Sequence, residues 1–161
     1  MGPVSLSQCV WSGAGGNDNW SNPANWVNGL VPPGRHPVVV DGEAGAAAQV
    51  LLEFDLELRS RSLTVAAGDT LTIGSGAIGK KVTLSVTGPD GLLTNGGTVA
   101  VSNYSILRRD PPATVSNAGG TVRRACHGAV DLGGFTGVVI VHDPCFWDGG
   151  GETNNWSEAA N

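Results

Sequence analysis

The chain has 161 residues, enough for one domain with a sizeable core, and its 25 Gly residues are about twice the usual share. Charged residues make up only 14% of the chain and its net charge is −5, which argues against nucleic acid or an anionic membrane surface as a partner. No apolar run approaches the ~20 residues needed to cross a bilayer, so membrane insertion is not expected.

A Trp-rich motif follows a short lead-in at residues 1–8 and occurs twice in the chain. The first copy begins at Cys9 and the second at Cys145, 136 residues later, and nine of the 17 aligned positions are identical. Self-similarity of this kind is typical of repeat proteins. We interpret the chain as one repeat plus the start of the next, with the motif and a turn-rich connector at 9–34, a body at 35–144, and the next motif at 145–161.

The body consists of short apolar runs that alternate with Thr and Ser at a period of two and are separated by Gly, Asn or Asp. This pattern predicts strands with one buried face, and no helical period of useful length occurs. The predicted strands include Val38–Asp41, Val50–Leu52, Leu56–Leu58, Leu63–Val65, Leu71–Ile73, Val82–Val86, Thr98–Val101, Thr121–Val122 and Val138–Val141.

A second, weaker repeat lies inside the body. Thr94–Val99 matches Ser116–Val122 after one inserted residue, and Val99 and Val122 are 23 residues apart. Coils of about twenty-odd residues, each with three short strands and corners of Gly and Asn, are what a parallel β-solenoid requires. The predicted fold class is therefore all-β, a parallel β-helix, with a β-sandwich as the alternative because it also has many short strands.

The Trp motif, the Asn28-Gly-x-Val-Pro connector and the run Leu63–Ile73 together resemble repeats of large secreted bacterial adhesin-like and haemagglutinin-like β-helix surface proteins. The resemblance covers most of the chain. It implies an extracellular or cell-surface location and a repetitive, non-catalytic scaffold or adhesin.

The three cysteines allow several interpretations of their chemical state. Cys9 and Cys145 occupy the same repeat position, so a disulfide between Cys126 and Cys145 would leave Cys9 free or paired with a neighbouring repeat. Such a staple would indicate an oxidising compartment. The alternatives are unpaired thiols, or a zinc site made by Cys126, His127, His142 and Cys145.

Five Trp residues all belong to the repeated motif: Trp11, Trp20, Trp26, Trp147 and Trp156. The favoured interpretation is a structural seam between consecutive repeats. The alternative is a platform on which sugar rings stack, which would make the chain a carbohydrate-binding module.

Two further site hypotheses are weaker. Asp18, Asp148 and Glu152 could bind calcium through carboxylate oxygens, although the two motif copies do not keep their acids at matching positions. A β-helix enzyme acting on polysaccharides would need clustered charged residues, and Arg109 and Arg123 could approach each other on adjacent coils. No carboxylate pair or catalytic motif accompanies them, so no catalytic residue and no obligatory cofactor are predicted.

The sequence thus favours a structural and adhesive repeat module that tiles end to end into a stiff rod or filament. Its expected partners are neighbouring copies or repeats of itself, and cell-surface glycans or proteins. A single repeat with open sheet edges at both ends should associate end to end.

Overall fold

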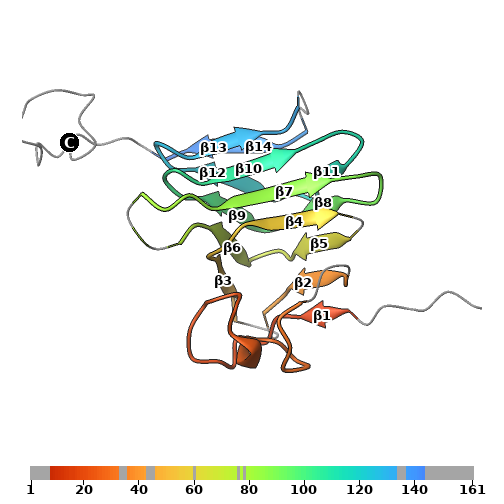
Figure 1. Ribbon diagram of the computed structural model, residues 1–161, viewed down its shortest axis with the longest axis vertical. Helices are drawn as coiled ribbons and strands as arrows, with labels where there is room; N and C mark the ends of the chain where they lie inside the picture. Colours follow the sequence, from red (N-terminus) through yellow and green to blue (C-terminus); the bar gives the residue numbers. More distant parts are fainter. Residues whose placement is uncertain are drawn as a thin grey trace, which may run out of the picture.

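Short parallel strands stacked in coils make up the protein (Figure 1). The computed structural model describes residues 8–32, 36–42, 46–59, 61–75, 77, 79–133 and 137–143. The strands of this part are β1 (Cys9–Val10), β2 (Val38–Val40), β3 (Gln49–Leu52), β4 (Leu56–Arg59), β5 (Ser62–Val65), β6 (Thr70–Ile73), β7 (Thr83–Thr87), β8 (Leu92–Asn95), β9 (Thr98–Val101), β10 (Ile106–Arg109), β11 (Thr114–Asn117), β12 (Thr121–Arg124), β13 (Ala129–Asp131) and β14 (Val139–His142).

The strands form three sheets in which all strand pairs are parallel. The first sheet has the order β1-β2-β5-β8-β11, the second β3-β6-β9-β12-β14, and the third β4-β7-β10-β13. From β2 to β13, consecutive strands of the chain therefore belong to different sheets, and every third strand returns to the same sheet one coil further on. This is a parallel β-solenoid, which confirms the predicted fold class and excludes the sandwich.

Alternation along each strand explains why the chain coils. In β5, β6 and β8 the second residue, Leu63, Leu71 or Leu93, is fully buried, while the Ser or Thr residues between the buried positions lie on the outer faces. The buried residues of all three sheets meet in one apolar core that runs through the stack. Each coil buries its apolar face only against its neighbours, so burial and stacking depend on each other.

The internal repeat recognised in the sequence sets the register of adjacent coils. Val99 of β9 pairs with Val122 of β12, and Asn95 of β8 pairs with Asn117 of β11. A Cβ on Gly97 would lie 2.3 Å from the backbone oxygen of Ala66, a distance that real Cβ atoms do not reach. Glycine is needed there because neighbouring backbones approach closely at the corner.

Five strands were not anticipated from the sequence, namely β1, β8, β10, β11 and β13. Their patterns are weak: β10 ends in two Arg residues, β11 reads Thr-Val-Ser-Asn, and β1 and β13 have two and three residues. Parallel pairing supplies the order that these short segments lack, on both sides for β8 and β10 and on one side for β1, β11 and β13.

The two ends of the described stack differ. At one end, the Trp motif folds into the compact loop drawn in red in Figure 1 and covers the first coil. At the other end lies β14, all four residues of which are exposed, with Val139 58%, Ile140 39% and Val141 44% accessible. No strand of the described chain pairs with its outer edge.

Candidate functional site

The Trp motif is the most specific feature of the sequence, and its three described indole rings form one buried cluster. Trp11, Trp20 and Trp26 are 3%, 0% and 2% exposed. The Trp26 ring packs edge-on against both others, with centroid distances of 5.1 Å to Trp11 and 4.9 Å to Trp20. Its Nε1 donates to the carbonyl of Trp20 at 2.9 Å. Edge-to-face packing adds stability beyond the area buried, so the cluster serves as a small core.

Burial of the rings bears directly on the two interpretations of the Trp residues. A sugar can stack only on an exposed aromatic face, and none of these three rings presents one. The cluster instead lies against the first coil of the solenoid as part of the main core. Trp147 and Trp156 lie outside the described residues.

A fully buried side chain, that of Asn25, holds the loop around the cluster. Its Oδ1 accepts from the Gly15 amide at 2.7 Å, and its Nδ2 donates to the carbonyls of Asn17 and Asn19 at 2.8 and 3.0 Å. Asn22 caps the short 3₁₀-helix Pro23–Asn25 by accepting from the Ala24 amide at 3.1 Å. The side-chain amides of Asn22 and Asn25 are thus bonded within the motif rather than offered to a ligand, whereas the buried Trp20 Nε1 has no partner.

The motif also pairs with the open edges of two sheets. Cys9 and Trp11 donate their amides to the carbonyls of Pro37 and Val39 beside and within β2. On the second sheet, the Trp20 amide donates to the Leu51 carbonyl at 2.9 Å, and the Leu51 amide donates to the Asp18 carbonyl at 2.7 Å. The edges of β2 and β3 are therefore covered.

The outward side of this cover is closed as well. In the parallel bridge to Leu51, the amide and carbonyl of Asn19 point away from β3. The Asn19 amide donates to Asn17 Oδ1 at 3.1 Å, and its carbonyl accepts from Asn25 Nδ2. On the first sheet, the outward carbonyl of Val10 accepts from the Val27 amide at 3.0 Å. The motif ends both ladders instead of extending them.

Positions that the two motif copies share are those that build this cap. Gly13 has φ +66° and lies against the Trp11 ring, and Gly15 has no room for a Cβ, which would fall 2.5 Å from Asn25 Oδ1. Ser21 donates its amide and its hydroxyl to the Glu53 carboxylate. Trp20 and Asn25 are the buried centre. In the described copy, the Gly, Ser, Trp and Asn residues that recur at 136-residue spacing are therefore capping residues.

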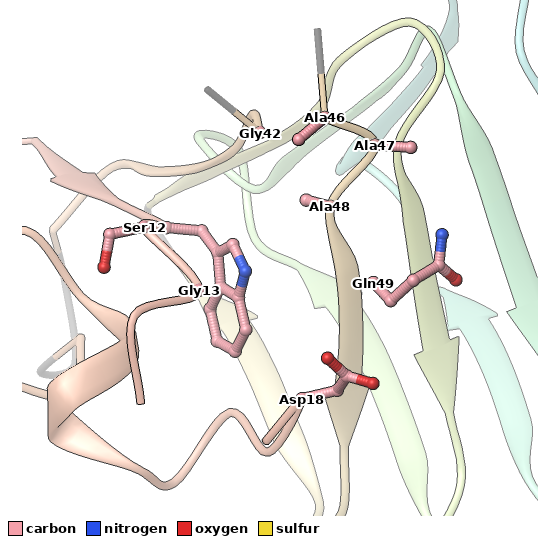
Figure 2. A pocket seen from close by; sticks show the side chains of 9 residues that line it. Ser12, Gly13, Asp18, Gly42, Ala46, Ala47, Ala48 and Gln49 are labelled. Atoms are coloured by element: carbon pink, nitrogen blue, oxygen red, sulfur yellow. The ribbon is translucent and has the colours of Figure 1, made fainter. Parts of the chain in front are cut away.

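A pocket of about 280 Å³ opens beside the cap, between the Trp motif and the segment that leads into β3. Figure 2 shows Asp18 and Gln49 at its rim and Ala46, Ala47 and Ala48 along one wall. Asp18 is the described member of the three acids considered for calcium, because Asp148 and Glu152 lie outside the described residues. One carboxylate, with only the Ser12 hydroxyl and the Gln49 amide as further side-chain oxygens in the lining, is a sparse donor set for that ion.

The cysteines lie far apart in the described part of the fold. Cys9 is a free thiol, 1% exposed, on β1 at the capped end. Cys126 follows β12, near the other end of the stack. Cys145 lies outside the described residues, so its pairing with Cys126 stays a prediction.

The remaining members of the suggested zinc set, His127 and His142, have separate surroundings. The His127 ring stacks on Tyr104, and His142 ends β14 opposite Arg124. In the described part of the chain, no three metal-binding side chains come together.

The two arginines considered for catalysis do not approach as adjacent-coil neighbours, and this expectation was wrong. Arg109 belongs to β10 of the third sheet and Arg123 to β12 of the second. Arg109 donates to the carbonyls of Ala113 and Leu132 at 2.7 and 2.8 Å and so fastens two loops. Arg123 forms an exposed ion pair with Asp143 at 2.6 Å. A separation of 14 residues is shorter than one coil, which is why it changes sheet.

A shallow hollow of about 380 Å³ on the outer face of the third sheet contains three acids that the sequence analysis did not group. Each acid is already engaged: Asp55 accepts from the Thr83 amide at 2.7 Å, Glu57 from the Thr87 hydroxyl at 2.6 Å, and Asp110 from Arg108 at 2.8 Å. Only the coil register reveals that these acids are neighbours.

Within the described residues, no helix is long and apolar enough to span a bilayer. Comparison of the chain with protein-family models, with curated protein sequences and with solved structures gave no match. The geometry of the cap and of the coils behind it is therefore the feature from which function can be inferred.

Proposed function

We propose that the chain is a structural repeat module of a large extracellular or cell-surface protein, in which coils provide a stiff rod and each Trp motif seals the start of a module. The observation that carries the proposal is the closed outer side of the cap, where the outward groups of Asn19 and Val10 are bonded inside the motif. A surface made for a ligand would leave such groups available.

This proposal changes how modules would join. The sequence favoured tiling through two open ends, but at the capped end the ladders of the first two sheets are terminated, and only β4 of the third sheet has an outer edge without a strand partner in the described chain. Successive modules would then be linked along the chain, with the motif as the joint. Any association of separate chains would use the end that carries β14.

The capping role can be tested by replacing Asn25. Asn25→Ala removes the acceptor of the Gly15 amide and the donor to the Asn19 carbonyl, so the motif should loosen and expose the edges of β2 and β3. We expect a loss of about 2–4 kcal/mol in the free energy of unfolding. We also expect assemblies larger than a dimer in light scattering, because both ends would then be open.

Asn28→Ala is the matched control, since Asn28 is exposed in the same loop and its side chain makes only a 3.4 Å bond to the Leu30 amide. This variant should behave as the wild type. An Asn25→Ala protein with unchanged stability and unchanged size distribution would remove the capping proposal.

The extracellular part of the proposal depends on the Cys126–Cys145 disulfide. Alkylation of the denatured, unreduced protein followed by mass spectrometry should find one free thiol, at Cys9, in agreement with its unpaired state in the structure. Three alkylated cysteines would contradict the staple and, with it, the assignment to an oxidising compartment.

A further inference from the structure

A small hollow at the corner between β9 and β10 combines an exposed aromatic ring with a cation. Its volume is about 250 Å³, and its lining includes Tyr104, Lys80, Ser75, Ser102 and Asn103. It lies on the flank of the solenoid, away from the Trp cap, and the sequence analysis did not identify it.

Tyr104 has a backbone conformation that a tyrosine rarely adopts. Its φ is +63°, and in the described chain every other residue with positive φ is a glycine. L side chains are strained there, and such strain persists where the surrounding structure enforces it, often at binding sites. A glycine would be the expected residue if only the turn mattered.

The next coil fixes the Tyr104 ring from one side. The His127 ring stacks on it with a centroid distance of 5.3 Å and an interplanar angle of 6°. The Tyr104 amide donates to the His127 carbonyl at 3.0 Å, and the His127 amide donates to Asn103 Oδ1 at 3.0 Å. Tyr104 is nevertheless 39% exposed, so its ring is pre-organised in a residue that is not buried.

The coil order places the hollow toward the opposite side of the ring. β9 pairs with β12, which leads to His127, and with β6, which leads to Ser75 and Lys80. His127 therefore follows Tyr104 along the stack, and the hollow lies between Tyr104 and the preceding coil. The result is a slot with an aromatic face as one wall.

The polar lining favours an anion that also carries hydroxyl groups. Lys80 is one of only two lysines in the chain, and the lining residues include no carboxylate. Ser75 and Ser102 add hydroxyls, and Asn103 keeps its amide nitrogen after its oxygen has accepted from His127. A slot below the roughly 300 Å³ of common ligand pockets suits a single ring.

We propose that this slot binds an acidic pyranose, a uronic acid residue of a surface glycan. The apolar C–H face of the sugar would lie on the free face of Tyr104, because the negative π-face attracts weakly positive C–H groups. The carboxylate would pair with Lys80, and ring hydroxyls would bond to Ser75, Ser102 and Asn103. This inference goes beyond the capping role and does not depend on it.

The test is an NMR titration of the ¹⁵N-labelled protein with methyl β-D-glucuronide, and with methyl β-D-glucoside as the uncharged match. Saturable shifts should occur at the amides of Lys80, Ser102 and Tyr104, with the glucuronide bound about fivefold or more tightly than the glucoside and less tightly at high salt. The absence of saturable shifts with the glucuronide, or equal affinity for both glycosides, would overturn the proposal.

Three variants separate binding from folding. Tyr104→Gly relieves the positive φ, so the protein should unfold no more easily than the wild type while its affinity for the glucuronide is lost. Lys80→Gln should abolish the preference for the glucuronide, whereas Lys81→Gln should retain it. Unchanged affinity in Tyr104→Gly, or an unchanged preference in Lys80→Gln, would show that the slot is not the binding site.

Discussion

Two buried polar side chains, those of Asn25 and Arg61, have opposite effects on the stability of this protein. Asn25 is fully buried, and both ends of its amide have partners. Arg61 is 4% exposed, and its Nε and Nη1 have no hydrogen-bond partner. Burial lowers the pKa of the Arg61 guanidinium, and an electrostatic interaction with Cys9 opposes that shift. A buried cation with unbonded donors lowers the stability of the folded state.

Arg61→Met should therefore stabilise the protein. The apolar side chain keeps most of the packing volume and removes the unpaired charge, so we expect the free energy of unfolding in urea to rise by on the order of 1 kcal/mol. Arg59→Met, at an exposed position of β4, is the control and should change it by less than about 0.5 kcal/mol. A destabilised Arg61→Met protein would indicate that the guanidinium has a compensating role.

Strands in this fold are ordered by pairing with strands of neighbouring coils. The side-chain hydrogen bonds of residues at equivalent corners can therefore be compared directly. Asn95 and Asn117 end β8 and β11 and pair in register. Asn95 is fully buried and its Nδ2 donates to the Thr121 carbonyl at 3.1 Å, whereas Asn117 makes no such side-chain bond in the described chain; the Oδ1 atoms of both residues have no partner. Equivalent residues of two successive coils thus have different surroundings.

Asn95→Ala should lower the free energy of unfolding by about 1–3 kcal/mol, because the Thr121 carbonyl loses a part-buried donor. Asn117→Ala removes no described side-chain bond and should cost less than about 0.5 kcal/mol. Chemical denaturation of the two variants gives the comparison, and equal losses would show that the corner bond is not what Asn95 contributes.

The coiled fold was predictable from the sequence, whereas the assignment of residues to sheets and to surface hollows was only partly predictable. The 23-residue spacing of Val99 and Val122 indicates the register because each residue of a coil stacks on its equivalent. The separation of Arg109 and Arg123 is shorter than a coil, and their positions in different sheets followed only from the unrecognised strand β10. The Tyr104 slot was missed because its residues come from consecutive coils and form no local pattern.

At the scale of the whole molecule, one end of the described stack has two of its three sheets closed by the cap, and the other end is open. The cap terminates the ladders of β2 and β3, while β14 exposes three apolar residues and an unpaired edge. Ile140 pairs with Val122, a core residue, and is exposed because no further described coil covers it. Separate chains should meet through this end.

Ile140→Lys should abolish association of the chain at high concentration, because a charge at the centre of the open end opposes its burial. Val27→Lys places the same charge on an exposed residue of the cap and should leave association unchanged. Sedimentation velocity over a wide concentration range distinguishes the cases. Loss of association in both variants would mean that the capped end takes part.

The registered glycines at the corners also bear on how such a protein can change its length. Gly97 and Gly120 follow equivalent strands, and each lets the backbone of the preceding coil approach without a Cβ in the way. We therefore expect that a coil with this glycine and the alternating core can stack on another coil of the same kind. Duplicating or deleting one coil of 23 residues would alter the rod by ~4.8 Å and leave both ends intact. The architecture therefore allows evolution to lengthen or shorten the rod in steps of one coil.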